Sequence, residues 1–147
     1  MSATEIQKLR ELTGAGVMEC KKAYEEAGGD LEKAVKIIKK RGLAKAEKRA
    51  GRKTGAGLVQ SYVHNERVGA LVELRSETDF VAHSEPFREL AKNLAMQIAA
   101  MAPENMEGLL SQPFIKDPEK TVKDLLSEVI SKVGENVQIG KFYRIEL

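Results

Sequence analysis

Cysteine and histidine are nearly absent from this sequence of 147 residues, which holds one cysteine, Cys20, and two histidines, His64 and His83. A single cysteine cannot close an intramolecular disulfide, and the two histidines lie too far apart in sequence to suggest a metal site. Cys20 falls in an apolar-leaning predicted helix, which is more typical of a core residue than of a reactive thiol. We therefore predict no redox chemistry, no metal ion and no cofactor.

Long apolar runs are missing too. No stretch approaches the roughly 18 consecutive apolar residues that cross a bilayer. The first residues, Met1-Ser-Ala-Thr-Glu5, lack the basic start and apolar core of a signal peptide. Hydrophobic residues make up 42% of the chain and charged residues 31%, a balance typical of folded soluble proteins. We expect a cytoplasmic protein without a membrane partner.

The motifs of common enzyme sites are also lacking. A nucleophilic triad needs a serine or cysteine beside a histidine, whereas Cys20 belongs to a predicted helical segment and His64 and His83 to a later one. Gly14-Ala-Gly16 lies between two predicted helices and not after a strand, so it does not match a phosphate-binding loop. We predict no catalytic residues and a function that is not enzymatic.

Residues 1–42 favour a bundle of short helices. Gly14-Ala-Gly16 separates the first helix from the second, and Gly28-Gly29 ends the second because glycine permits the left-handed turn that terminates helices. Asp30 can cap a third helix, whose apolar stripe runs until Gly42. A bundle of this size buries little surface, and such modules serve as docking platforms.

A basic segment follows the bundle. Between Lys36 and Lys53 the only acid is Glu47, and residues 43–54 are mostly good helix formers without an apolar face. This pattern indicates a helical linker. Its charge fits either a solvated helix or a contact surface for an acidic partner or RNA, and both interpretations stay open.

From residue 55 onward the sequence predicts an α+β core. Alternating apolar residues at Val68, Ala70, Val72 and Leu74 predict a strand that forms an antiparallel hairpin with residues 58–64. Two amphipathic helices follow, the first opened by Ser84-Glu-Pro86 and the second by Asp117-Pro118. A third strand is predicted from the alternation of apolar residues at the C-terminus, namely Val137, Ile139, Tyr143, Ile145 and Leu147.

These elements give an α+β fold with an N-terminal three-helix module and a small three-stranded antiparallel sheet that has helices packed on one face. We predict three parts: the module at 1–42, the basic linker at 43–54 and the core at 55–147.

Two long segments resemble the signatures of a known family. Leu12-Thr-Gly-Ala-Gly-Val-Met-Glu-Cys-Lys-Lys-Ala23 resembles the N-terminal signature of elongation factor Ts, and Glu77-Thr-Asp-Phe-Val-Ala82 resembles its second signature. Shorter similar segments occur in the family's order and extend the resemblance over nearly the whole chain: Arg41-Gly-Leu-Ala-Lys45, Arg67-Val-Gly-Ala-Leu-Val-Glu73, Gln112-Pro-Phe-Ile-Lys116 and Gly134-Glu-Asn-Val137.

The resemblance implies a guanine-nucleotide exchange factor that clasps the GTPase EF-Tu and releases its GDP, with a ubiquitin-associated-like module before the core. The family's second signature enters the GTPase near its magnesium site. By resemblance, this role falls on Asp79 and Phe80, with Thr78 and Val81 shaping the turn. Met18 and Lys21 are further expected contacts of the module.

Two expected contact residues also have a purely structural interpretation. His64 matches a family histidine at the hairpin turn that touches another domain of the partner, although from the residues alone an exposed turn histidine fits function and no function equally. The residues alone favour packing of Phe80 into the core, whereas the resemblance favours its projection from the turn. We expect projection.

The chain departs from the family between its two core helices, where residues 103–110 replace the long helical hairpin of many relatives. It also has one core unit where longer relatives carry two, so we expect a homodimer. The competing hypothesis is a basic, translation-associated RNA-binding protein, although aromatic residues for base stacking are few. A ubiquitin-binding adaptor would use the same module but leave residues 78–81 unexplained.

Overall fold

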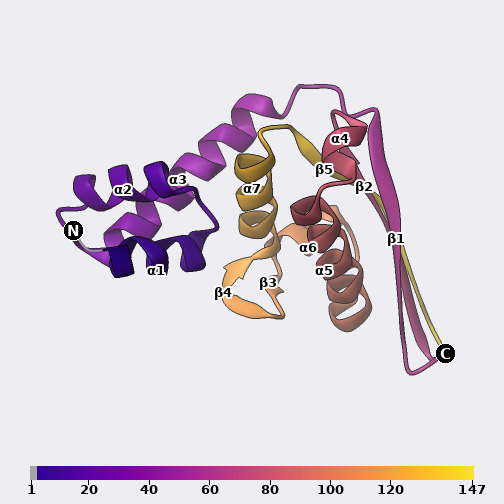
Figure 1. The fold of residues 1–147 in the computed structure, drawn as a ribbon. Helices are drawn as coiled ribbons and strands as arrows, with labels where there is room; N and C mark the ends of the chain where they lie inside the picture. Colours follow the sequence, from indigo (N-terminus) through magenta and orange to yellow (C-terminus); the bar gives the residue numbers. More distant parts are fainter. Residues whose placement is uncertain (1–2) are drawn as a thin grey trace.

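The computed structural model describes residues 3–147 as a helical module joined to an α+β core (Figure 1). The module comprises α1 (Ala3–Thr13), α2 (Val17–Glu26) and α3 (Leu31–Arg49). The core comprises a three-stranded antiparallel sheet, a two-stranded one, and the helices that pack against them. The predicted fold class is confirmed.

The module is held together by a small apolar cluster of its own. Leu9, Cys20, Ala23 and Ala34 are fully buried, so Cys20 is a core residue as predicted. The Asp30 carboxylate accepts a hydrogen bond from Lys33 N at 3.2 Å, which confirms the predicted cap of α3.

The predicted end of the third helix at Gly42 is wrong, because α3 continues to Arg49. Gly42 is buried where α3 packs against α7 (Val122–Val133). One helix therefore belongs to the module at its start and to the core at its end. The predicted division at residues 42 and 54 stays a prediction.

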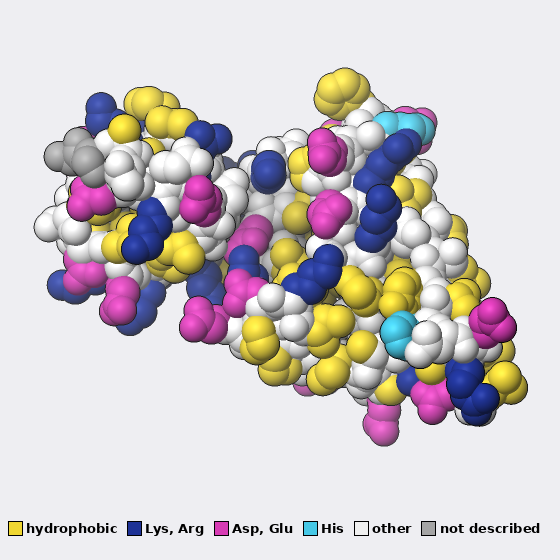
Figure 2. Space-filling view, turned by 60° about the horizontal axis from the view of Figure 1, so that its bottom comes forward, with side chains coloured by type: hydrophobic (Ala, Val, Ile, Leu, Met, Phe, Trp, Pro, Cys, Tyr) yellow, Lys and Arg dark blue, Asp and Glu magenta, His cyan; other side chains and the backbone are white. Residues whose placement is uncertain are grey.

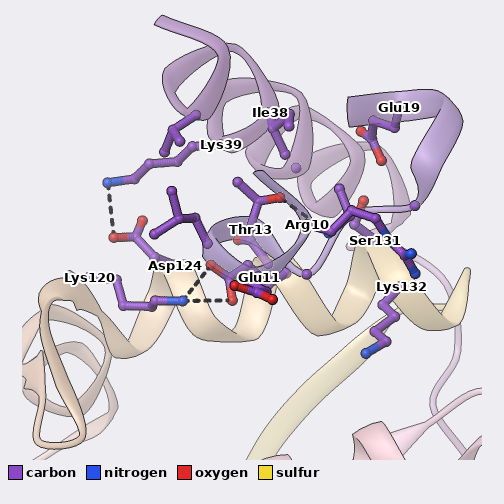
Figure 3. Close-up of a pocket in the computed structure, with 18 of the residues that line it drawn as sticks. Arg10, Glu11, Thr13, Glu19, Ile38, Lys39, Lys120, Asp124, Ser131 and Lys132 are labelled. Atoms are coloured by element: carbon purple, nitrogen blue, oxygen red, sulfur yellow. Dashed lines mark hydrogen bonds and ion pairs between the residues drawn. The ribbon is translucent and has the colours of Figure 1, made fainter. Parts of the chain in front are cut away.

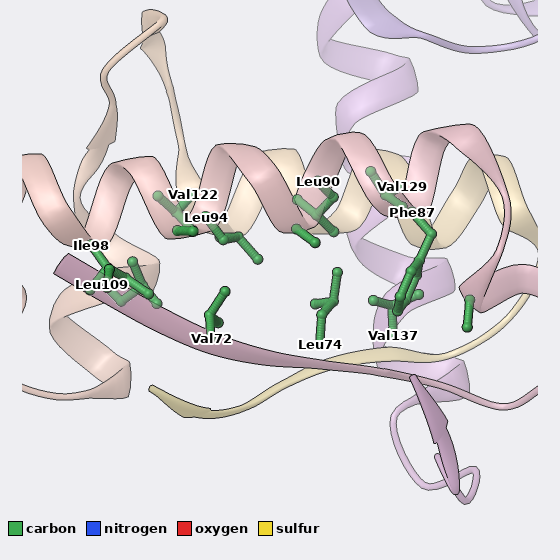
Figure 4. Packing of buried hydrophobic residues seen from close by; sticks show 14 of the residues in the cluster. Val72, Leu74, Phe87, Leu90, Leu94, Ile98, Leu109, Val122, Val129 and Val137 are labelled. Carbon is green, nitrogen blue, oxygen red and sulfur yellow. The ribbon is translucent and has the colours of Figure 1, made fainter. Parts of the chain in front are cut away.

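The main sheet has the order β1-β2-β5, with β1 at Ala56–His64, β2 at Val68–Ser76 and β5 at Val137–Glu146. The predicted hairpin is confirmed, since His64 pairs with Val68 across the turn. Helix α5 (Glu85–Met101) covers one face, and Figure 4 shows its apolar side chains pointing at those of the sheet. The buried residues of this contact include Val72, Leu74, Phe87, Leu90, Leu94, Ile98 and Val137.

The predicted alternation of β5 is wrong beyond its first half. The pairing shifts between Val72, opposite Phe142, and Leu74, opposite Ile139, so β5 carries an extra residue there. A β-bulge of this kind reverses which side chains face the core. Phe142 consequently packs against the core cluster, whereas Tyr143 and Ile145 lie exposed on the opposite face of the sheet.

The predicted helix start at Asp117-Pro118 is also wrong. Asp117–Thr121 forms β4, which pairs with β3 (Pro113–Phe114), and α7 begins at Val122. Thr121 caps α7 through a capping box: its hydroxyl accepts from Asp124 N at 3.1 Å, and the Asp124 carboxylate accepts from Thr121 N at 2.9 Å. This reciprocal pair satisfies two backbone donors and fixes the start of the helix.

Two further elements complete the core. The connector between α5 and α7 includes a short helix, α6 (Met106–Ser111), whose cap is the Asn105 side chain. The first predicted core helix starts where expected, although the Ser84 hydroxyl donates to Val81 O at 2.6 Å and does not cap α5. No helix within residues 3–147 has the length and apolarity to cross a membrane.

Candidate functional site

The second signature forms an exposed turn with a buried base. Asp79–Ala82 is the short helix α4, capped by the Thr78 hydroxyl, which accepts from Val81 N at 3.3 Å. Val81 and Ala82 are buried and packed into the core cluster. Phe80, in contrast, is 87% exposed, so its ring projects from the turn as the resemblance implies. Asp79 is exposed beside it, and Asp79 O contacts His83 Nδ1 at 2.7 Å.

A carboxylate from a distant loop holds the start of this turn. Glu135, which follows α7, accepts hydrogen bonds from Glu77 N at 3.1 Å, Thr78 N at 3.0 Å and the Thr78 hydroxyl at 2.7 Å. Glu77 returns the interaction, because its own carboxylate accepts from Asn136 N at 2.8 Å. We call Glu77, Thr78, Glu135 and Asn136 the carboxylate clamp.

The clamp also reaches the end of α3. The buried Asn136 side chain donates to Arg52 O at 2.8 Å and to Ala50 O at 3.4 Å. Arg52 in turn lies 3.4 Å from the Glu77 carboxylate. Three segments that are far apart in sequence therefore meet at the signature turn.

Sequence reasoning did not find the clamp. Glu135 and Asn136 follow Gly134, which only predicted the end of a helix, and their partners lie more than fifty positions earlier in the chain. The resemblance of residues 134–137 to a family segment was the one signal that pointed to this loop.

The remaining predicted contact residues lie on separate parts of the surface. Met18 is 64% exposed on α2, and Lys21 is exposed on the same helix. His64 is exposed at the far end of the β1–β2 hairpin, where its Nδ1 lies 2.9 Å from the Tyr62 hydroxyl. Figure 1 shows the module, α4 and the hairpin turn at three corners of the molecule. These residues do not line one pocket, and only an extended partner can touch them all.

A groove of about 610 Å³ lies between the module and the core. It is lined by α1 and α3 on one side and by α7 and β4 on the other, and Lys39 bridges it by an ion pair with Asp124 at 3.1 Å (Figure 3). Both signs of charge line it, since Lys120 contacts Glu128 at 2.9 Å. The space-filling view shows the same hollow between two lobes (Figure 2).

Two carboxyl groups of α7 in this groove differ in their pKa. Burial raises the pKa of Glu128, and the Lys120 ammonium offsets only part of that rise. Burial also acts to raise the pKa of Asp124, but hydrogen bonds from Thr121 and the charge of Lys39 outweigh it, so the pKa lies below its ordinary value.

Five of the nine basic residues at 36–53 have a partner within the chain. Arg41 contacts Glu26 at 2.5 Å, Lys45 contacts Glu19 at 3.1 Å, and Arg49 donates to Ile130 O at 2.7 Å. Lys39 and Arg52 are paired as described above. Figure 2 shows basic and acidic side chains interspersed on the visible face. These five side chains brace the chain internally, which weakens the hypothesis that the whole segment is a phosphate-binding surface for RNA.

Comparisons with known proteins cover nearly the whole chain. The sequence model of a family described as Elongation factor TS matches residues 3–107 and 77–147. A protein named Elongation factor Ts from Thermodesulfovibrio yellowstonii is 40% identical over 191 aligned positions, which include 100% of this chain and 96% of that relative.

Two further relatives of the same name give similar values. The protein from Thermotoga petrophila is 45% identical over 186 positions, covering 97% of this chain and 94% of its own. The protein from Solidesulfovibrio magneticus is 44% identical over 193 positions, covering 100% and 96%. The aligned lengths exceed the 147 residues of this chain, so these relatives carry residues that have no counterpart here.

Proposed function

Because this chain belongs to the elongation factor Ts family of translation elongation factors, we propose that it binds the GTPase EF-Tu and accelerates the release of GDP from it. The observation that supports this most strongly is the exposure of Phe80, 87% of whose surface faces solvent on a turn that buries the next two residues. The ring makes little contact within the chain, so it is available to a partner.

The proposed chemistry is non-covalent, with no catalytic residue and no cofactor. Asp79 brings a carboxylate, a hard oxygen donor suited to magnesium or its water shell, next to the aromatic ring of Phe80. Inserted beside the nucleotide, the pair would separate the ion from the groups that hold it. A thousandfold faster release needs about 4 kcal/mol of preferential stabilisation along the release path, which a few buried contacts can supply.

Exchange has no direction of its own. A factor that binds the nucleotide-free GTPase more tightly than the loaded form weakens nucleotide binding, and by linkage that nucleotide weakens factor binding by the same ratio. The cellular excess of GTP over GDP then sets the outcome.

The other contact residues fit an extended embrace of the partner. We assign Met18 and Lys21 to the nucleotide domain of EF-Tu, which the module lies against, and His64 to a second domain reached by the hairpin. Thr78 and Val81 shape the turn from below: Thr78 by capping α4, and Val81 by its burial.

We also propose that the protein is a homodimer joined through the open face of its sheet. Five large apolar side chains are at least 47% exposed on this face: Val59, Val63, Leu71, Tyr143 and Ile145. An apolar patch of this extent marks an interaction surface. Two twisted sheets pack face to face, and a two-fold axis lets one surface serve both copies. A second copy would supply the surface that a duplicated core gives longer relatives.

The test is release of a fluorescent GDP from purified EF-Tu in the presence of this protein or its variants. We expect acceleration by the parent and a loss of most of it in Phe80→Ala and Asp79→Ala. Met101→Ala is the matched control, because it truncates an exposed apolar side chain on α5, away from the turn. If the parent leaves release by active EF-Tu unchanged, the proposed function is wrong.

A further inference from the structure

We infer that Glu135 is a positioning residue for exchange, which acts through the carboxylate clamp by holding the Asp79–Phe80 tip in its working orientation. The consequence for GDP release rests on the proposed function, whereas the geometry of the clamp does not.

The side chain of Phe80 has few contacts within the chain that could orient it. Phe80 is 87% exposed, so its direction is set by the backbone of residues 77–82. The far end of that segment is fixed by the burial of Val81 and Ala82. The near end lies at Glu77 and Thr78, both of which donate their backbone N–H to Glu135.

Glu135 is suited to hold this end firmly. One carboxylate receives three donors at 2.7 to 3.1 Å, and hydrogen bonds to a charged acceptor are stronger than neutral ones. The Thr78 hydroxyl connects the two ends of the turn, because it donates to Glu135 and accepts from Val81 N. Removal of the carboxylate therefore loosens the cap of α4 as well as the entry to it.

The clamp also sets the tip relative to the module. Asn136 is fixed at both its backbone and its side chain. Its backbone N–H donates to the Glu77 carboxylate, and its side-chain amide donates to Ala50 O and Arg52 O just beyond α3. A side chain that displaces groups in a partner must be held rigidly, because a small displacement of a positioned group greatly reduces its effect on the reaction.

The first experiment is a double-mutant cycle on GDP release with Glu135→Ala, Phe80→Ala and the double variant. We expect Glu135→Ala to lower the maximal release rate about tenfold, while the factor concentration at half-maximal effect changes by less than about threefold. If Glu135 acts through the tip, its loss should lower the rate that remains in Phe80→Ala by much less than tenfold, because only Asp79 of the tip is left to position. Additive losses would overturn the inference, as would a parent-like rate in Glu135→Ala.

The second experiment needs no GTPase and follows amide hydrogen exchange by NMR in the free protein. We expect the Thr78 amide to exchange about tenfold faster in Glu135→Ala, and less so in Glu135→Gln, which keeps the shape and one acceptor oxygen. Glu89→Ala, which removes an exposed glutamate of α5, is the control. Unchanged exchange at Thr78 would overturn the clamp even if GDP release is accelerated. Faster exchange combined with no effect of the parent on EF-Tu would support the clamp and refute the proposed function.

Discussion

Phe80 and Phe87 are the same residue type seven positions apart, yet one is 87% exposed and the other fully buried. Burial of an aromatic side chain contributes to folding, and exposure contributes nothing. Phe87 packs into the cluster between α5 and the sheet. The two positions therefore separate the proposed partner contact from stability within one segment.

We expect Phe80→Ala to change the free energy of unfolding by no more than about 0.5 kcal/mol, the range of ordinary surface substitutions. Phe87→Ala should cost about 3 to 5 kcal/mol, because it leaves a cavity in the core. Urea denaturation followed by circular dichroism measures both. A large loss of stability in Phe80→Ala would show that the ring packs in the free protein, contrary to its exposure.

Asp124 and Glu128, one turn apart on α7, should contribute to stability with opposite dependence on pH. The pKa of Asp124 is lowered in the folded state, so its contribution is present above the ordinary carboxyl range and is lost as pH falls through the folded value. The pKa of Glu128 is raised, so the folded chain loses stability from this group as pH rises from the ordinary carboxyl range through the folded value.

We expect Asp124→Asn to cost about 1 to 2 kcal/mol at neutral pH, because it weakens the capping box and the ion pair with Lys39. The difference from the parent should shrink on acidification. For Glu128→Gln we expect a difference of the opposite sign. The variant should gain stability relative to the parent as pH rises, because its neutral amide is not penalised by burial as the charged carboxylate is. Denaturation curves at a series of pH values test both signs, and a pH-independent difference for Asp124→Asn would contradict the assignment.

At the scale of helices and strands, the strongly periodic segments were predictable and their exceptions were not. Helix α5 and strand β2 each bury one regular face, which their apolar spacing alone indicated. The bulge in β5 escaped prediction because an extra residue is set by pairing with β2, not by the sequence of β5. The helix start predicted at Asp117-Pro118 was wrong because the capping box at Thr121 makes the helix begin later.

The candidate site was also predictable only in part, because some of its contacts depend on residues that are distant in the sequence. The family resemblance located the turn, and the exposure of Phe80 agrees with it. Local pattern alone favoured burial of Phe80, since the next two residues are apolar and do pack inward. Glu135 and Asn136 act through contacts that are distant in sequence, which no local pattern carries.

Strand β1 depends on glycine at one position. Gly57 has φ of +146°, and a Cβ there would meet Leu74 O and the backbone of Arg75. We expect Gly57→Ala to destabilise the protein by about 1 to 3 kcal/mol.

Gly55→Ala is the control for this strand, because a Cβ at Gly55 meets open space. It should be neutral or stabilise by up to about 1 kcal/mol through the unfolded state. Chemical denaturation midpoints decide between the two sites, and equal effects would contradict the strain assigned to Gly57.

At the scale of the whole molecule, the proposed dimer can be tested by charge placed on the open face of the sheet. Tyr143→Glu combined with Ile145→Glu should shift the protein to monomer, because it puts like charges that cannot pair with each other into an apolar interface. Sedimentation velocity over a range of concentrations measures the change. Met101→Glu, an exposed apolar position on α5, should leave the association intact. A parent that is monomeric at high concentration would refute the dimer.

The continuous helix α3 fixes the rotational orientation of the module relative to the core. Its 19 residues run without a break from the cluster of the module to the core, where Arg49 donates to Ile130 O. Each residue of an α-helix turns the chain by about 100° and advances it by about 1.5 Å. One inserted residue near position 43 would therefore swing Met18 and Lys21 to another side of the molecule, whereas seven would return them almost to their azimuth. The direction in which the module faces relative to Phe80 is thus set by the number of residues in α3.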